Sequence, residues 1–285
     1  MNGDVDTATV RRLFGRLEAV HTVAYFAPHV LEVQRQHGFT DPSIGYVAAR
    51  SAPLGEVPAE VTTAVFYSFS ADVIGRAIPH AYTVQSPKDT LAMTLASVGD
   101  VLGALFHDVD TLKETADAAY EAAMLHPLVG VPLGAAWASV APSDVPAVKL
   151  WQASSIIREV RGDIHIALLM ANGLDGVEAH LTTRGDTPKL REIIGKQRLI
   201  TDDAFDAAVG RLQARGLLND DGSLTTDGEA LRHQLEADTD RLTRGPWQQF
   251  GAARATQLMA DLDPLVARII DAKLVPGIVA RAATG

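Results

Sequence analysis

The stretch from Trp151 to Gly173, WQASSIIREVRGDIHIALLMANG, decides the fold class that we predict for this chain. It has the length and pattern of one long helix, because at 100° per residue its apolar side chains gather on one side. The nearly opposite side carries Trp151, Ser154, Arg158, Arg161 and His165. From Ile164 onward almost every side chain is apolar, so we expect the second half of the helix to be enclosed and the first half to meet water.

The cationic stripe on this helix has two interpretations. An arginine stays charged, so a buried one needs an acidic partner or an anionic ligand. Arg158, Arg161 and His165 could therefore line a pocket that binds an anion or moves a proton. Alternatively, the two arginines pair with carboxylates of neighbouring helices, and His165 is a hydrogen-bonded core residue. The pattern alone does not separate these readings, and it identifies no reaction.

Composition points to a mostly helical globular chain. Its 285 residues allow one large or two ordinary domains, and a hydrophobic content of 47% is enough for a sizeable core. Aromatic residues make up only 6% and alanine is abundant, which favours close-packed helices over sheets. We find no stretch before Gly173 that alternates apolar and polar residues for long enough to form a strand.

Charge and motif content narrow the expected partners and location. The net charge of −10 repels nucleic acid, which disfavours DNA as a partner without excluding it. The absence of cysteine excludes disulfides and thiolate metal sites. The acidic start, MNGDVDTATV, is not a signal peptide, and no uninterrupted apolar run approaches the length of about 18 residues that a membrane span needs. We therefore expect a cytoplasmic protein with no membrane association.

A second polar group is predicted on a helix from about Thr7 to Phe26. Its members share one face by their spacing and are Phe14, Glu18, His21 and Tyr25. A carboxylate one turn from an imidazole can raise its basicity, and a phenol can donate a proton or orient a ligand. The simpler alternative is that these residues only pack, with their polar tips bonded to the backbone.

Further candidates lie at helix ends and in an aromatic cluster. Arg50 precedes the rigid loop SAPLGEVP, where it could contact a ligand or simply complement a helix dipole. Phe66 and Tyr67 would form either a pocket wall or a core wedge. Asp163 is a supporting proton-transfer candidate. The sequence shows no Ser-His-Asp order, no HExxH and no histidine set spaced for a metal, so we predict no metal site and name no cofactor.

The C-terminal third resembles a known DNA-binding fold. The segments RLQARGLL and SLTTDGEALR resemble the recognition helix, wing and following helix of winged helix-turn-helix domains of the MarR kind, over about residues 175–245. Leu217–Leu218 and Ser223–Thr225 flank an Asp221–Gly222 turn, which predicts a small two-stranded wing. The expected fold class is therefore mostly α, with a helical N-terminal domain and a C-terminal winged-helix module.

The charged residues of this module are not those expected on a DNA-binding surface. Residues at the start of a recognition helix enter the major groove and should be basic or polar, but here they are Asp202, Asp203, Phe205 and Asp206. Between Asp186 and Gly245 there are nine Lys and Arg against twelve Asp and Glu, a net charge of −3. We therefore expect a structural or dimerising module that is degenerate for DNA binding.

The whole chain also resembles a largely uncharacterised actinobacterial family, in which a helical region precedes such a module. The resemblance is carried by HTVAYFAP (21–28), GYVAARSAPLG (45–55), FYSF (66–69), REVRGDIHIALL (158–169) and RGLL (215–218). It brings no activity to this chain. Because its motifs fall on the polar positions selected above, it favours one shared site that contains His21, Arg50, Arg158, Arg161 and His165.

These observations lead to a defined set of predictions. We expect a helical ligand-pocket domain over 1–174, a winged-helix-like module over 175–245, and C-terminal helices over 246–285 that pack on the chain or form a homodimer. The leading function is binding of an anionic or polar metabolite, and whether the protein is an enzyme stays open. A ligand-responsive winged-helix regulator and a helical scaffold are the alternatives. Proton-transfer candidates are His21, His165, Tyr25 and Asp163, and ligand contacts are Arg50, Arg158, Arg161, Phe66, Tyr67 and Trp151.

Overall fold

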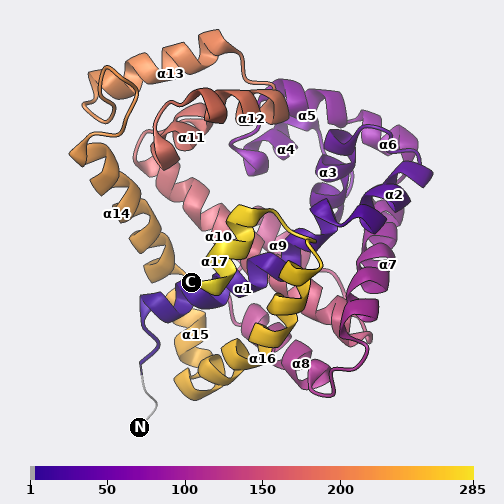
Figure 1. The fold of residues 1–285 in the computed structure, drawn as a ribbon. Helices are drawn as coiled ribbons and strands as arrows, with labels where there is room; N and C mark the ends of the chain where they lie inside the picture. Colours follow the sequence, from indigo (N-terminus) through magenta and orange to yellow (C-terminus); the bar gives the residue numbers. More distant parts are fainter. Residues whose placement is uncertain (1–3) are drawn as a thin grey trace. The chain divides into compact units, whose positions relative to one another are not determined.

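A computed structural model describes residues 4–285, which form two compact units (Figure 1). Unit 1 contains residues 4–56, 81–164 and 240–285, and unit 2 contains residues 57–80 and 165–239. These units are defined by contacts within the chain, and the domain boundaries that we predict at residues 174 and 245 stay a prediction. Residues 1–3, which belong to the stretch used to argue against a signal peptide, lie outside the described residues.

Unit 1 holds most of the long helices. They are α1 (Thr7–Phe26), α2 (Pro28–Gln36), α3 (Pro42–Ser51), the 3-10 turn η1 (Ala52–Leu54), α6 (His80–Val84), α7 (Pro87–Phe106), α8 (Leu112–Met124), α9 (Pro132–Ala138), α10 (Pro146–Ala171), α15 (Arg244–Phe250), α16 (Ala252–Asp271) and α17 (Gly277–Thr284). Of α10, the residues up to Ile164 belong to this unit. The helix α1 packs against α16 and α17, which lie beside it in Figure 1.

Unit 2 is smaller and is also built of helices. It contains α4 (Ala59–Phe66), α5 (Ala71–Ala77), the end of α10, α11 (Gly176–Arg184), α12 (Pro188–Arg198), α13 (Asp202–Ala214) and α14 (Thr226–Leu242) up to Thr239. Its core contains Leu181, Phe205, Ala208 and Leu212, all fully buried. The helices α12 and α13 are joined by only three residues, which gives the helix-turn-helix arrangement.

Short-range signals in the sequence fix where several helices begin. Asp41, Ser86 and Thr201 each accept a hydrogen bond from a main-chain amide of the first turn, as their types and positions predict. The first helix is capped by Asp6, whose carboxylate accepts from the Thr9 amide at 2.7 Å. These caps satisfy amides that the helix itself leaves without partners.

The long central helix was predicted correctly, but the prediction of which half is enclosed was wrong. Between Ala147 and Val160 every residue of α10 except Lys149 and Arg158 is buried, whereas Met170 is 63% exposed. The hydroxyls of Ser154 and Ser155 bond back to the carbonyls of Leu150 and Trp151, each at 2.9 Å. Because such back-bonding satisfies a serine within its own helix, polar residues can occupy a fully buried half.

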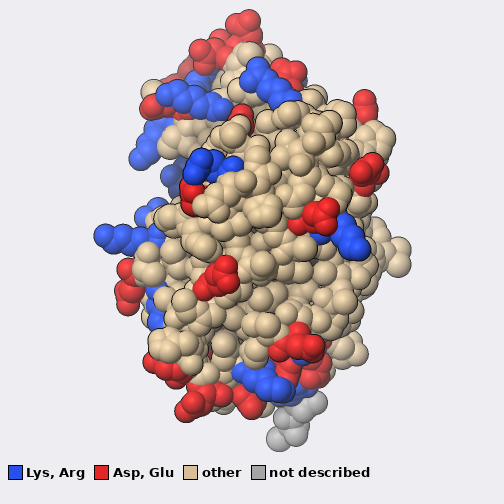
Figure 2. All heavy atoms as spheres, turned by 90° about the vertical axis from the view of Figure 1, so that its right-hand side faces the viewer, with Lys and Arg blue, Asp and Glu red and all other residues tan. Residues whose placement is uncertain are grey.

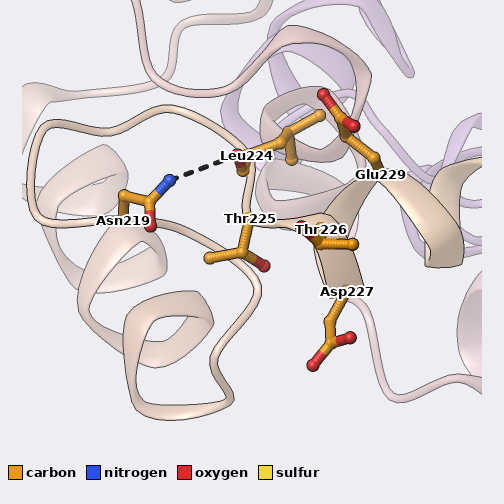
Figure 3. Close-up of a pocket in the computed structure, with 6 residues that line it drawn as sticks. All are labelled: Asn219, Leu224, Thr225, Thr226, Asp227 and Glu229. Carbon is orange, nitrogen blue, oxygen red and sulfur yellow. Dashed lines mark hydrogen bonds between the residues drawn. The ribbon is translucent and has the colours of Figure 1, made fainter.

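The prediction of a two-stranded wing was also wrong, whereas the predicted mostly helical fold class is confirmed. Residues 4–285 contain no strand, and Leu218 and Leu224 form a single isolated antiparallel bridge. The reason is local, since α14 begins at Thr226 and leaves no room for a second strand after the bridge. A hollow of about 420 Å³ lies at this turn. Of the residues that line it, Asp227 and Glu229 point in different directions (Figure 3).

One helix among the described residues, α7, is long and apolar enough to cross a membrane by length and composition. The buried core helix of a globular protein passes the same test. The residues of α7 that are buried recur every three or four positions, which is the pattern of a helix with one face in a core, and include Thr90, Met93, Thr94, Val98 and Leu102. This helix is therefore a weak indication of a membrane span.

Candidate functional site

The candidate site is a buried polar group in unit 1 that we call the Glu159 cluster. It brings together Glu18, His21 and Tyr25 from α1, Arg50 from α3, and Ser155, Arg158 and Glu159 from α10. Four of the residues that the sequence selected, His21, Tyr25, Arg50 and Arg158, are thus assembled around a carboxylate that the sequence did not select.

Glu159 is the centre of this cluster. Only 1% of its side chain is exposed, and it accepts two hydrogen bonds from Arg50, from Nε and Nη2, both at 2.8 Å. Arg158 Nη1 donates a third, also at 2.8 Å. Burial alone would raise the pKa of Glu159, but the charges of Arg158 and Arg50 outweigh it and lower the pKa to about 2. Glu159 is therefore ionised at neutral pH, and the Arg50 fork is fully engaged.

His21 is held neutral in the cluster. Burial and then the charge of Arg158 lower its pKa to about 3, although Glu159 acts in the opposite direction. Its Nδ1 lies 3.0 Å from Ser155 Oγ, and its Nε2 lies 3.9 Å from Glu159 Oε1. The order Ser155, His21, Glu159 has the residue types of a hydrolytic triad, but all three side chains are buried and the serine lies within α10. This geometry does not present a nucleophile to a substrate.

Two polar atoms of the cluster have no hydrogen-bond partner among residues 4–285. They are the hydroxyl of Tyr25 and Oε2 of Glu18, and both atoms are buried. Arg158 Nε lies 3.6 Å from that carboxylate oxygen, which is ion-pair distance but too long for a hydrogen bond. Burial raises the pKa of Glu18, and burial together with the charge of Glu159 raises the pKa of Tyr25. Tyr25 therefore keeps its proton, and its hydroxyl has no hydrogen-bond acceptor among residues 4–285.

Two tryptophans fix the main chain on either side of the cluster. Trp151 Nε1 donates to the carbonyl of His21 at 3.0 Å, and Trp137 Nε1 donates to the carbonyl of Arg50 at 3.2 Å. The two indoles meet edge to face, with centroids 5.2 Å apart, and Trp151 also stacks on the His21 ring. Trp151 therefore acts as a positioning residue for α1.

The remaining unit 1 candidates have partners away from Glu159. Arg161 pairs with Asp240 at 2.8 Å and lies over the ring of Phe14, with 4.5 Å to its centroid. Asp163 Oδ2 accepts from the amides of Leu133 and Gly134, each at 2.9 Å, at the start of α9. Burial raises the pKa of Asp163 to about 6. Its position indicates that it anchors α9.

Three other candidates belong to unit 2. His165 Nδ1 lies 2.9 Å from Thr239 Oγ1, and Phe66, which is 2% exposed, packs edge to face on Phe69. The hydroxyl of Tyr67 donates to the carbonyl of Leu174. The convergence of His165 with His21 on one pocket therefore stays a prediction.

Sequence reasoning missed Glu159 although a signal was present. The residues at every fourth position of α10, Trp151, Ser155, Glu159 and Asp163, form a stripe, and all four are buried. Because Glu159 lies on the same stripe as the apolar Trp151, it is expected to face the core. A buried carboxylate needs a cationic partner, and arginines were already known on the same helix. Within residues 4–285, no three His, Asp or Glu side chains group as metal ligands.

The helix-turn-helix of unit 2 presents acidic groups where α13 begins. The side chains of Asp202 and Asp206 are 86% and 67% exposed, and Arg191 pairs with Asp206 and with Asp186, each at 2.7 Å. On the face shown in Figure 2, Lys and Arg lie among Asp and Glu and do not form a continuous basic surface. The fold is thus that of a helix-turn-helix protein, while the charges are not those of a DNA-facing surface.

The comparison with known families agrees with this fold. The chain belongs to a helix-turn-helix family, whose sequence model matches residues 10–276 and therefore covers both units. No curated protein and no solved structure matches the chain.

Removing the charge of Glu159 should strongly destabilise unit 1. Glu159→Gln leaves Arg50 and Arg158 without their shared counter-charge, and breaking a buried ion pair costs about 3–5 kcal/mol. We expect this loss in the free energy of unfolding measured with urea, or no cooperative transition. Glu121→Gln breaks the exposed pair with Arg254 and is the matched control, for which we expect little change. Equal effects would contradict the central role of Glu159.

His21 should make unfolding sensitive to acid. Its pKa is about 3 when folded against 6.5 when free, so the unfolded chain binds a proton first as the pH falls. Its contribution to stability is complete above pH 6.5 and is lost progressively between pH 6.5 and 3. Between pH 6 and 5 the free energy of unfolding should fall by about 1 kcal/mol more in the wild type than in His21→Gln.

His126 and His180, whose pKa values burial also lowers, titrate in both proteins, so the difference isolates His21. Parallel pH profiles for the two proteins would show that the pKa of His21 is the same in the folded and unfolded states, and would contradict its burial as a neutral group.

Proposed function

We propose that unit 1 binds a small polar molecule at the Glu159 cluster, through the Tyr25 hydroxyl and the Glu18 carboxyl. The observation that carries this proposal is that the Tyr25 hydroxyl and Oε2 of Glu18 are buried atoms without a hydrogen-bond partner among residues 4–285. The Glu18 side chain as a whole is 23% exposed, and its ion pair with Arg158 is 3.6 Å long. An unsatisfied buried polar group costs about 1–3 kcal/mol, so a molecule that bonds to both groups would bind with a corresponding gain.

The charges of the cluster favour a neutral ligand. Arg50 and Arg158 both donate to Glu159, so the cations that the sequence offered to an anion are already engaged. Tyr25 needs an acceptor, and Glu18 needs a donor when ionised or either kind of group when protonated. A molecule that carries both, such as an alcohol or an amide, meets these needs, whereas an anion would also face Glu159.

Binding is better supported than catalysis. A histidine with a pKa of about 3 is a weak base at neutral pH, and general bases work best with pKa values near the working pH. The Ser155 hydroxyl is buried and bonded within its own helix. We therefore assign no reaction to His21, Tyr25 or Asp163.

A ligand-responsive transcriptional regulator is the second candidate. It is favoured by membership of a helix-turn-helix family and by the α12–α13 arrangement. The resemblance of residues 175–245 to modules of the MarR kind, and of the chain to an actinobacterial family, supports the same proposal. Against it, unit 2 carries nine Lys and Arg and fifteen Asp and Glu. We infer that α13 does not read DNA in this protein, and that the module instead serves the architecture or a partner.

The binding site is tested by thermal shift against a panel of neutral polar metabolites. A hit should stabilise the wild type by about 2.7 kcal/mol at a hundred times its dissociation constant. Tyr25→Phe and Glu18→Gln should lose this stabilisation, whereas Tyr120→Phe, on α8, should keep it. If no compound shifts the wild type, or if Tyr25→Phe responds as the wild type does, the unpartnered groups hold only water and the proposal fails.

The regulator alternative is tested by fluorescence anisotropy with the DNA upstream of the protein's own coding sequence, at low salt. We expect no specific binding, because Asp202, Asp203 and Asp206 would face phosphate. As a control, Asp202→Asn with Asp206→Asn removes two of these charges and should raise weak, non-specific affinity. Tight wild-type binding with a steep salt dependence, competed only by the same DNA, would establish the regulator instead.

A further inference from the structure

Unit 2 contains a groove that lies away from the turn between α12 and α13. The end of α10, the start of α11, the last turn of α13 and Tyr67 form it, and its volume is about 680 Å³. Its apolar lining includes Tyr67, Met170, Leu174 and Ala214. Leu174 belongs to the core of unit 2 and Tyr67 packs against that core, whereas Met170 is 63% exposed. Met170 is therefore the member of the apolar lining that a bound molecule could cover.

The acidic residues of the groove are fully engaged. Asp175 accepts from the amides of Val177 and Glu178 at 2.9 and 2.8 Å, and from Arg211 Nη2 at 2.5 Å. Glu178 accepts from the Asp175 amide and from Arg211 Nε, each at 2.8 Å. This arrangement is a capping box closed by one arginine. Each carboxylate oxygen in it already accepts a hydrogen bond, so these acids are poor partners for a cationic ligand.

Arg215 differs from Arg211 because its partners among residues 4–285 are uncharged. It donates from Nη1 to the carbonyl of Gly173 at 2.9 Å and from Nη2 to that of Asn172 at 2.8 Å. These carbonyls complement its charge only partly, as the C-terminus of a helix does. A guanidinium has five N–H donors, so donors remain for an anion. Arg211 lies on α13 and Arg215, four residues later, is its C-cap in αR conformation, which places both positive charges at the same side of the groove.

Tyr67 is held beside the groove in a strained backbone conformation. Its φ of 29° is uncommon for an aromatic residue, and such strain costs about 1–3 kcal/mol and gathers at ligand sites. The hydroxyl bonds to the Leu174 carbonyl, so the ring is fixed as one wall. Its main chain also packs closely on α11, where a Cβ at Gly176 would lie 2.4 Å from the Tyr67 carbonyl oxygen. The wall is thus fixed before any ligand arrives.

We propose that this groove binds a small amphipathic carboxylate, with the anionic head on Arg215 and the apolar tail over Met170 and Tyr67. An apolar floor and a cation without an acidic partner complement such a molecule, whereas a neutral apolar ligand would leave the arginine unused. The occupant would touch the last turn of α13, the second helix of the helix-turn-helix. This site lies in unit 2 and is independent of the Glu159 cluster.

The experiment is isothermal titration of the full chain with octanoate, compared with octan-1-ol and octylamine. We expect octanoate to bind and the alcohol and the amine to bind at least ten times more weakly. Arg215→Gln should weaken octanoate binding about tenfold or more, and Met170→Gln should weaken it severalfold. Arg184→Gln, which removes the same charge from the exposed end of α11, is the matched control and should bind as the wild type does.

Because Arg215 also bonds to the end of α10, the thermal unfolding of each variant is measured beside binding. Met170→Gln changes an exposed side chain and tests the groove even if Arg215→Gln does not fold. The proposal is overturned if octanoate does not bind at millimolar concentration, if octan-1-ol binds equally well, or if Arg184→Gln weakens binding as much as Arg215→Gln. Tyr25→Phe should leave octanoate binding unchanged, so this result is separate from the outcome for unit 1.

Discussion

The buried carboxylate of Glu159 is the constraint on which the interior of unit 1 depends. Two guanidinium groups lie against it, and neither arginine can lose its charge to escape burial. Removing such ions from water costs several kcal/mol each, so this core is possible only because the charges meet at hydrogen-bond distance. The pairing also ties α3 to α10, since Arg50 and Glu159 are 109 residues apart in the chain. A specific ionic contact therefore sets the relative position of these two helices.

The protonation states around Glu159 follow from burial and from the same pairing. Burial, and then the positive charges of Arg158 and Arg50, lower the pKa of His21 and keep it neutral. Burial, and then the negative charge of Glu159, raise the pKa of Tyr25, so that it keeps its proton. Glu18 lies at the edge, where burial favours its neutral form and Arg158 opposes this. The cluster thus contains one engaged ionic centre with a neutral imidazole and a neutral phenol beside it, which is an environment for polar recognition more than for proton transfer.

The sequence predicted those parts of the structure that depend on neighbouring residues. The caps at Asp41, Ser86 and Thr201 and the length of α1 follow from local hydrogen bonds and periodicity, which short stretches contain in full. The polar positions and the family resemblance favoured one site that contains His21, Arg50, Arg158, Arg161 and His165. Of these, His21, Arg50 and Arg158 lie around Glu159, whereas Arg161 pairs with Asp240. The partner of the arginines was not predicted, because which carboxylate reaches Arg50 depends on how α3 packs against α10. For the same reason, periodicity alone misjudged which half of α10 is enclosed.

The resemblance to winged helix-turn-helix domains predicted the two helices α12 and α13 but not the local structure after α13. The segment after α13 does turn at Gly222 and bring Leu218 opposite Leu224, as a wing would, but the next helix begins two residues later. A strand needs several residues in ladder geometry, so a turn of this length gives a bridge and no sheet.

The spacing of α12 and α13 follows from the apolar core that they share, and this core includes Phe205 and Leu212. DNA reading depends on the exposed positions of α13, which the core does not constrain. The helix-turn-helix fold is therefore compatible with an acidic surface, and here the exposed carboxylates of Asp202 and Asp206 lie at the start of α13, beside Arg191 of α12.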